Sequence, residues 1–436
     1  MRDVLLLLVV FGALPIILVR PYVGVLVWSW LGYMNPHRLT WGFAYDLPLA
    51  FVVALTTLAA ILLSNERKRI PVTWLTCLWI VFVMWMGVTT IFAIYPAEAW
   101  IQYEKVLKIQ LMTVTTVLLM GSRERLRMLI WIIVISLGYY GVKGGVFTII
   151  NGGDYHVWGP PDTFIEGNNE LALALLMILP LMHYLRTTSA NKWIRLGLLA
   201  SMILCAFSIV GSQSRGALVG GIAMTLFLWL KAKRKLVTGA ILVVMLPLLI
   251  AFMPAQWYER MQTIETYEAD ASAMGRIDIW KMALRLANDK LMGGGFELWT
   301  DETFDRYTPQ KTNSHDAHSI YFKVLGEHGW IGLILFLGIG LSAWRTGARI
   351  VRQTKHHPEL EWLSSLARML QVSLAAYATG GAFLGLSYFD LYWHLVAMLV
   401  IGAEMVRQHE PHATGRAASI GSSLAPQYAN HSASRQ

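Results

Sequence analysis

Residues 193–235 read WIRLGLLASMILCAFSIVGSQSRGALVGGIAMTLFLWLKAKRK, and this stretch decides the class of fold. Two apolar segments, 193–211 and 215–231, are each close to the length that crosses a bilayer, and a very short turn joins them. Basic residues flank the pair at its outer ends, whereas Arg215 lies in the turn. The pattern predicts two adjacent transmembrane helices that meet on one side of a membrane.

The composition of the whole chain agrees with a membrane protein. Of its 436 residues, 56% are hydrophobic and only 14% are charged, whereas about a quarter of a soluble domain is charged. This balance excludes a soluble enzyme, a disordered protein and a secreted disulfide scaffold. The net charge of +9 comes from basic clusters between apolar segments, so we expect no nucleic-acid partner. Cys77 and Cys205 lie within apolar segments and are expected to form neither a disulfide nor a metal site.

Further apolar segments of spanning length recur along the chain. They run over 44–64, 74–94, 105–120, 126–150, 169–185, 236–252, 317–344, 365–384 and 391–406. Residues 4–34 are also apolar but are interrupted at Arg20-Pro21, so they form either one span with an interfacial helix or two short spans. We prefer a single crossing, which predicts an all-α polytopic membrane protein with about 12 transmembrane helices and both termini inside.

Loops that are rich in Lys and Arg alternate with loops that contain neither. The basic loops lie near 67–69, 123–127, 186–195, 231–235 and 345–355, and the loops without Lys or Arg lie near 95–104, 151–168 and 385–390. Because cationic loops are retained in the cytoplasm, the first set is predicted to be inside and the second outside.

One outside loop, 253–316, is far longer than the others. Apolar residues at helical spacing predict a helix over 276–287 within it, and the loop is expected to fold over the membrane surface. Its aromatic residues Trp257, Tyr258 and Trp299 are expected near that surface. Residues 1–407 are therefore predicted to form one transmembrane domain, and 408–436, rich in Ser, Ala, His and Gly, a disordered cytoplasmic tail.

Two arginines lie at the outside ends of predicted helices. Arg215 opens a span beside Ser214, and its planar guanidinium fits phosphate oxygens, although an arginine that reaches the interface is an equal alternative. Arg276 begins the predicted loop helix. Taken alone, it is more simply interpreted as a solvated arginine paired with Asp278 or Glu268.

Histidine and asparagine residues occupy two further outside positions. His318 follows His315 and Asp316 where the long loop meets the next span, and a histidine there can accept a proton near neutral pH. A metal bound by His315 and His318 is the alternative, but no third ligand occurs at a recognisable spacing. Asn168 and Asn169 start another span, where they either cap the helix or contact a sugar or phosphate.

Three short motifs resemble, in order and spacing, the signatures of the O-antigen ligase and polymerase superfamily. They are Ser214-Arg215-Gly216-Ala217, Gly275-Arg276-x-x-x-Trp280, and Ala317-His318-Ser319-x-Tyr321 followed by Leu325-Gly326-Glu327-x-Gly329. The resemblance covers roughly residues 1–405. The stretch 138–145, with Pro160-Pro161 and Asn168-Asn169, is similar to the exosortase-associated O-glycosylation ligase branch.

The resemblance implies a membrane glycosyltransferase of the GT-C class whose reaction is metal-independent and inverting. It implies a site facing the periplasm of the bacterial inner membrane, where a glycan moves from undecaprenyl pyrophosphate to a hydroxyl of lipid A-core oligosaccharide. These two substrates and membrane lipid are the implied partners, and no cofactor is implied. Arg215 and Arg276 match the arginines that hold the pyrophosphate, and His318 matches the histidine that activates the acceptor. The candidate substrate-binding residues are Ser214, His315, Asn168, Asn169 and Tyr321.

Other functions remain open at this point. An O-antigen polymerase or a protein O-oligosaccharyltransferase of the same superfamily shares the reacting groups, so the sequence separates them poorly from a ligase. A transporter predicts charged residues within helices and paired broken helices, whereas the charges here cluster at helix ends apart from Lys143 and Arg20.

Overall fold

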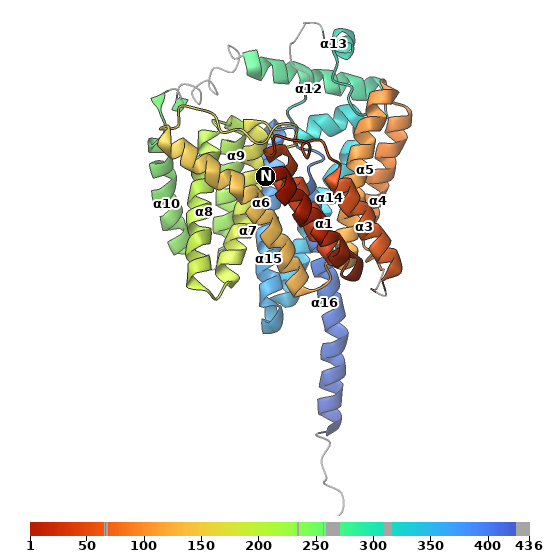
Figure 1. Cartoon of the computed structure of the whole chain (residues 1–436), viewed down its shortest axis with the longest axis vertical. Coiled ribbons are helices and arrows are strands. Elements are labelled where there is room, and N and C mark those ends of the chain that lie inside the picture. The colour runs from red at the N-terminus through yellow and green to blue at the C-terminus, as the bar shows by residue number, and fades with distance from the viewer. Residues whose placement is uncertain are drawn as a thin grey trace, which may run out of the picture.

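The structure is a computed structural model that describes residues 1–64, 66, 69–232, 235–255, 257–258, 271–308 and 316–423. Within these residues the regular structure is entirely helical. Most helices run side by side in one bundle, and α12 (Ala271–Asp289) lies across one end of it (Figure 1). The predicted all-α class is therefore confirmed.

The helices of the bundle follow the predicted apolar segments. They are α1 (Arg2–Val19), α2 (Tyr22–Met34), α3 (Leu49–Leu63), α4 (Trp74–Ile91), α5 (Pro96–Leu119), α6 (Arg123–Ile150), α7 (Asn168–Thr188), α8 (Lys192–Gly211), α9 (Arg215–Lys231), α10 (Lys235–Ala251), α14 (Ile320–Gln353), α15 (Glu361–Gly380) and α16 (Asp390–Ser423). Short 3-10 turns connect some of them: η1 (Pro36–Leu39), η3 (Thr354–His356), η4 (Pro358–Leu360) and η5 (Gly381–Phe383). Because α16 continues past Gln408, the predicted start of the tail lies within a helix, and the division into domain and tail stays a prediction.

Among the described residues, six helices are long and apolar enough to cross a membrane, namely α1, α4, α6, α7, α8 and α14. The helices α2 and α3 are apolar but shorter. In α8 only 28% of the most apolar stretch is buried, and large side chains such as Trp193 and Leu196 are exposed. Lipid covers apolar faces of this kind, so the chain is a multi-pass membrane protein. The figure of about 12 crossings stays a prediction.

Residues 4–34 form two helices that run antiparallel. The helix α1 ends before Arg20, and Pro21 occupies the N-cap of α2. The first turn of α1 lies beside the segment that follows α2, because Arg2 donates a hydrogen bond of 3.3 Å to the Leu39 carbonyl. Of the two, α1 is long and apolar enough to cross a membrane and α2 is shorter, so the preferred single crossing and the alternative of two short spans both stay predictions.

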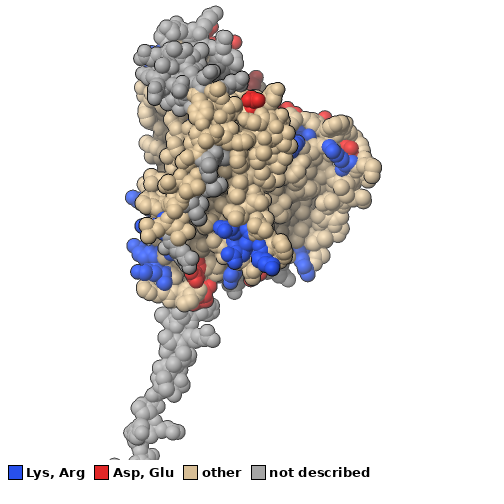
Figure 2. All heavy atoms as spheres, turned by 90° about the vertical axis from the view of Figure 1, so that its left-hand side faces the viewer, with Lys and Arg blue, Asp and Glu red and all other residues tan. Residues whose placement is uncertain are grey.

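The predicted loop helix is confirmed and is longer than expected. It is α12, and with α13 (Asp301–Tyr307) it covers one end of the bundle (Figure 1). On the face seen in Figure 2, most of the visible Lys and Arg gather toward the opposite end, below a broad belt with few charged residues. The basic ends of the helices and the loop helix thus lie on opposite sides of this belt.

Small residues bring α6 and α8 into close contact. A Cβ added at Gly145 lies 2.0 Å from the Leu204 carbonyl oxygen, and one at Gly141 lies 2.3 Å from Cys205 Sγ. Helices in lipid associate through such close packing because their surroundings are as apolar as their side chains. Cys205 is a buried packing residue, and both cysteines are free, as predicted.

We expect Gly145→Ala to lower the free energy of unfolding by about 1–3 kcal/mol, because a methyl group cannot fit against a backbone carbonyl without moving the helices apart. Thermal unfolding of the detergent-purified protein, followed by circular dichroism, measures the change. Gly197→Ala on α8 is the matched control, since nothing lies within 4 Å of its added Cβ. Equal melting temperatures for the two variants would contradict the packing described.

Candidate active site

Trp280 of α12 joins the second and third motifs. Its indole ring stacks on Phe322 of α14, with centroids 4.8 Å apart and planes 9° apart. Its Nε1–H donates a hydrogen bond of 2.9 Å to the Ala317 carbonyl, immediately before His318. These contacts fix the start of α14 beneath α12.

The first motif lies at the start of α9, close to the contacts around Trp280. Ser214 caps this helix, and its hydroxyl accepts a hydrogen bond of 3.1 Å from the Ala217 amide. Arg215 is therefore the first helical residue. A Cβ added at Gly216 lies 3.0 Å from Cβ of Phe383, whose ring centroid is 6.2 Å from that of Trp280. Phe383 thus links the start of α9 to the contacts around Trp280.

His318 has an unusual backbone conformation. Its φ is +43°, a left-handed value that costs a non-glycine residue about 1–3 kcal/mol unless its surroundings enforce it. Its amide donates a hydrogen bond of 3.3 Å to Asp316 Oδ2, and its Nδ1 lies 3.5 Å from the same oxygen. Lys323 donates to the other oxygen, Oδ1, at 3.0 Å.

The charges around His318 favour a neutral imidazole beside an ionised carboxylate. Burial is the largest influence and lowers the pKa of His318; Asp316 opposes this, and Arg276 and Lys323 lower it further. Burial acts to raise the pKa of Asp316, but Lys323 and His318 hold it below its ordinary value. A neutral imidazole can accept a proton, so His318 has the protonation state that a general base needs.

The electrostatic interactions also place Arg276 and Glu170 in this group. Arg276 is close enough to His318 to act on its charge. Glu170 in the first turn of α7 interacts with Arg276, Asp316 and Lys323. Sequence analysis did not select Glu170, although an acidic residue that begins an apolar helix is itself a signal of a functional site.

The predicted substrate-binding residues Asn168, Asn169 and His315 differ in their positions and contacts. Gly167 is the N-cap of α7, so the expected capping by Asn168 and Asn169 is wrong. The buried Asn168 side chain instead donates a hydrogen bond of 2.7 Å to the Ser212 carbonyl in the turn before α9, and Asn169 is half-buried beside it. His315 lies outside the described residues.

A break in α14 explains the third motif beyond His318. Gly329 has φ +66°, and a Cβ there lies 2.1 Å from the Leu291 carbonyl oxygen, so only glycine fits. The carbonyls of Gly326, Glu327 and His328 bind groups outside the helix. Their donors are the amides of Gly294 and Gly295 and the indole of Trp85, at 2.8–2.9 Å.

Buried side chains stabilise this break. The carboxylate of Glu327 accepts hydrogen bonds from Trp299 Nε1, at 2.9 Å, and from the Tyr388 hydroxyl. That hydroxyl also lies 2.8 Å from Nε2 of His328, whose Nδ1 is 2.7 Å from the Thr89 hydroxyl. The indole of Trp299 is buried against Glu327, and its predicted position near the membrane surface stays a prediction.

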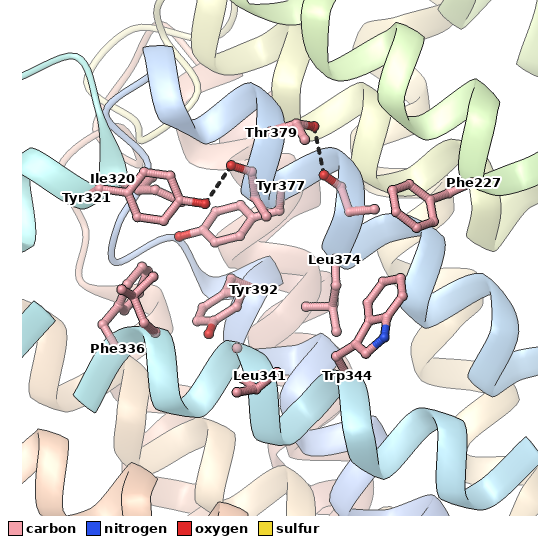
Figure 3. Close-up of a pocket in the computed structure, with 14 residues that line it drawn as sticks. Phe227, Ile320, Tyr321, Phe336, Leu341, Trp344, Leu374, Tyr377, Thr379 and Tyr392 are labelled. Atoms are coloured by element: carbon pink, nitrogen blue, oxygen red, sulfur yellow. Dashed lines mark hydrogen bonds between the residues drawn. The ribbon is translucent and has the colours of Figure 1, made fainter. Parts of the chain in front are cut away.

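An apolar cavity of about 370 Å³ lies beside α14 (Figure 3). Its α14 lining comes from Tyr321, three residues after His318, and from the stretch between Phe336 and Trp344 on the other side of the break at Gly329. Tyr321 donates a hydrogen bond of 2.6 Å to the Ala378 carbonyl at the end of the cavity nearest His318. Other lining residues are Phe227, Phe336, Leu374, Tyr377 and Tyr392.

A possible metal-ligand set among the described residues lies at the other end of α14. His357, Glu359 and His409 place one ligand atom each within 4.8 Å of one another. The Glu359 carboxylate lies 3.2 Å from His357 and 2.8 Å from His409, and these hydrogen bonds account for the arrangement without an ion. The predicted absence of a metal at His318 stays a prediction.

The fold and the site define a multi-pass membrane protein in which arginine and histidine motifs converge at one end of a helical bundle, next to an apolar cavity. The chain matches two known families. Residues 200–337 match the family described as O-Antigen ligase, and residues 1–190 match a family of unknown function, DUF5935. The first match supports the O-antigen ligase and polymerase superfamily and a glycosyltransferase-like enzyme. No curated protein matches the chain. The proposed exosortase-associated branch stays a prediction.

Tyr388→Phe is expected to lower the free energy of unfolding by about 1–3 kcal/mol, because it removes a buried donor to the Glu327 carboxylate. Tyr392→Phe is the control, since the Tyr392 hydroxyl is buried and makes no hydrogen bond to the described residues. Thermal unfolding in detergent compares the two. A control variant that loses as much stability as Tyr388→Phe would contradict the role given to the buried hydrogen bonds.

Proposed function

We propose that the protein is an O-antigen ligase, which transfers a glycan from undecaprenyl pyrophosphate to a hydroxyl of lipid A-core oligosaccharide. The observation that carries the proposal is the meeting of the three motifs around Trp280, at one end of the bundle and next to the apolar cavity. The match of residues 200–337 to the O-Antigen ligase family supports chemistry of this kind.

The proposed site faces the periplasm from the bacterial inner membrane. The positive-inside rule supports this orientation, because Lys and Arg gather at the end of the bundle opposite α12 (Figure 2). An undecaprenyl-linked donor on the outer leaflet then has its head group level with Arg276 and His318. The cavity beside α14 has the apolar lining that an isoprenoid chain requires.

The two arginines hold the pyrophosphate in this proposal. A guanidinium presents paired N–H donors that match phosphate oxygens, and its charge persists at any physiological pH. Arg215 starts α9, so the positive end of the helix dipole adds to its potential. Ser214 fixes this turn as its N-cap, while Tyr321 closes the near end of the cavity.

The chemical step is an inverting displacement. The acceptor hydroxyl oxygen forms a bond to the anomeric carbon as the bond from that carbon to the phosphate oxygen breaks. The hydroxyl proton passes to Nε2 of His318, and the electron pair of the broken bond stays on the pyrophosphate. Arg215 and Arg276 stabilise the added negative charge on the leaving group, so the proposed step is metal-independent.

Complementation of a deletion strain tests this function. We expect the strain to make lipopolysaccharide with a bare core and to retain polymer on undecaprenyl pyrophosphate. His318→Ala should reduce restored transfer by about 10²–10⁴-fold, since that is the usual contribution of a general base. Arg276→Ala should also abolish restoration, and the control Arg285→Ala, an exposed arginine on α12 that bonds the Tyr307 carbonyl, should not. Lipopolysaccharide gels measure transfer, and immunoblots of membrane fractions measure expression of each variant.

The deletion strain also distinguishes the alternatives within the superfamily. Loss of a polymerase leaves core carrying a single repeat, and loss of a protein O-oligosaccharyltransferase leaves normal lipopolysaccharide with unmodified periplasmic proteins. Either phenotype would replace the ligase by the corresponding enzyme. Full transfer by an expressed His318→Ala variant would remove the proposed general base.

Gly340→Leu tests the cavity. An added Cβ at Gly340 has the Tyr392 hydroxyl as its nearest neighbour, at 3.7 Å, so a leucine fits and narrows the cavity without disturbing the helix. We expect KM for the lipid-linked donor to rise about 10-fold with little change in kcat, since only binding of the apolar chain is weakened. Gly197→Leu, an exposed glycine on α8, is the control. An unchanged KM for Gly340→Leu would exclude the cavity as the site of the lipid.

A further inference from the structure

Asp316 lies between His318 and Lys323 and contacts both. One carboxylate oxygen, Oδ2, accepts the His318 amide at 3.3 Å and lies 3.5 Å from the ring nitrogen Nδ1. The other, Oδ1, accepts from Lys323 at 3.0 Å. The His318 Nδ1 atom is buried and makes no hydrogen bond to the described residues. Asp316 Oδ2, 3.5 Å away, is an acceptor within reach of this nitrogen, and a small shortening of the contact in the substrate complex would complete the hydrogen bond.

A glycine on another segment makes room for the carboxylate. Gly385 lies in the loop between η5 and α16, and a Cβ added there would lie 2.4 Å from Asp316 Oδ2. Lys323 and Gly385 thus confine the carboxylate from two sides. The hydrogen bond that the His318 amide donates to Asp316 also helps to hold the left-handed backbone at His318.

We propose that Asp316 is a positioning residue, which holds the His318 ring with its proton on Nδ1 and leaves Nε2 free to accept the proton of the acceptor hydroxyl. The proposal rests on the proposed function, because it assigns Asp316 a role only if His318 acts as the base. The principle is general: the hydrogen bond made by one ring nitrogen sets the tautomer and frees the other.

The surrounding positive charges leave the Asp316 carboxylate to stabilise a protonated His318 ring. After proton transfer His318 becomes a cation, and the charges that act on it are Arg276 from α12, Lys323 from α14 and Asp316. Among the described residues that act on His318, Asp316 is the one that favours the charged ring. Glu170 and Glu297 interact with the neighbours of His318. Glu170 interacts with Arg276, Asp316 and Lys323, and Glu297 interacts with Lys323. Asp316 therefore stabilises the imidazolium that the reaction produces, as well as orienting the ring.

Asp316→Asn changes the pH dependence in a defined direction. Asp316 raises the pKa of His318, so its neutralisation lets burial, Arg276 and Lys323 lower that pKa further. The rate of a reaction that needs neutral His318 rises with pH through this pKa. The acidic limb of the kcat/KM profile should therefore move to lower pH in Asp316→Asn, while the rate on the plateau falls about 10²-fold or more because the tautomer is no longer fixed.

The test measures transfer by the full-length protein in detergent, with an undecaprenyl-pyrophosphate glycan as donor and lipid A-core as acceptor, from pH 5 to 9. Asp316→Glu keeps the charge and should recover part of the rate. Gly385→Ala changes no titratable group but displaces the carboxylate, and should shift the limb in the same direction as Asp316→Asn. Asp301→Asn, an exposed aspartate on α13, is the matched control and should behave as the unmodified protein.

A second measurement reports on His318 without any substrate. Diethyl pyrocarbonate reacts with the neutral form of imidazole and not with the protonated form. The full-length protein is modified at each pH and then digested, and mass spectrometry of the peptide that contains His318 gives the extent of its modification. The pH midpoint of this modification therefore follows the protonation of His318. The midpoint should fall in Asp316→Asn and in Gly385→Ala and stay unchanged in Asp301→Asn. This measurement holds even for a variant that is inactive, and melting temperatures verify that each variant is folded.

The outcomes separate the two proposals. An inactive His318→Ala with wild-type rate and pH profile in Asp316→Asn would overturn the role of Asp316 and leave the proposed function intact. A slower Asp316→Asn whose acidic limb and modification midpoint do not move would show a merely structural effect and also overturn the role. Full activity of His318→Ala would instead remove the proposed function, and with it the reaction in which Asp316 takes part.

Discussion

The contacts of Trp280 are the interaction on which the proposed site depends. This one side chain, on a helix that lies across the bundle, stacks on the first turn of α14 and hydrogen-bonds the chain directly before His318. Its neighbour Phe383 packs against the start of α9. Segments more than a hundred residues apart in the sequence thereby meet at one point. Met282, Ala283 and Leu286 of α12 pack in the same cluster as Trp299 and Ala317, so the contacts of Trp280 add to a wider interface that holds α12 over the bundle.

The charged residues of the proposed site lie at the end of the bundle, where a charge costs less than at the centre of a bilayer. A cation at the centre of a bilayer is costly, whereas at the rim of a helical bundle it stays partly hydrated and still acts through a medium of low polarity. Arg276, Lys323, Asp316 and His318 occupy such a rim, with acidic and basic groups alternating. Any binding of a diphosphate here replaces water around groups whose geometry is already fixed, which is the source of electrostatic stabilisation in enzymes.

Sequence predicted the helical class, most helices of the bundle and the three motifs, because apolar periodicity and isolated polar groups are local signals. It did not predict that residues 4–34 pair as antiparallel helices, since the interruption at Arg20-Pro21 fits either one span with an interfacial helix or two short spans. Nor did it predict that Asn168 reaches the Ser212 carbonyl or that Trp299 is buried on Glu327. Those partners lie far away in the chain, and only tertiary packing brings them together.

The glycine break in α14 separates two tasks within one helix. The arm before Gly329 is tied by backbone hydrogen bonds to the segment around Gly294 and carries the groups beside His318, whereas the arm after it lines most of the cavity. A rigid, unbroken helix would transmit any bend or side-chain change along its whole length. With the break, cavity residues such as Phe336 and Trp344 can be substituted while the polar end keeps its geometry. The helix is in this sense modular, and its two arms are free to evolve at different rates.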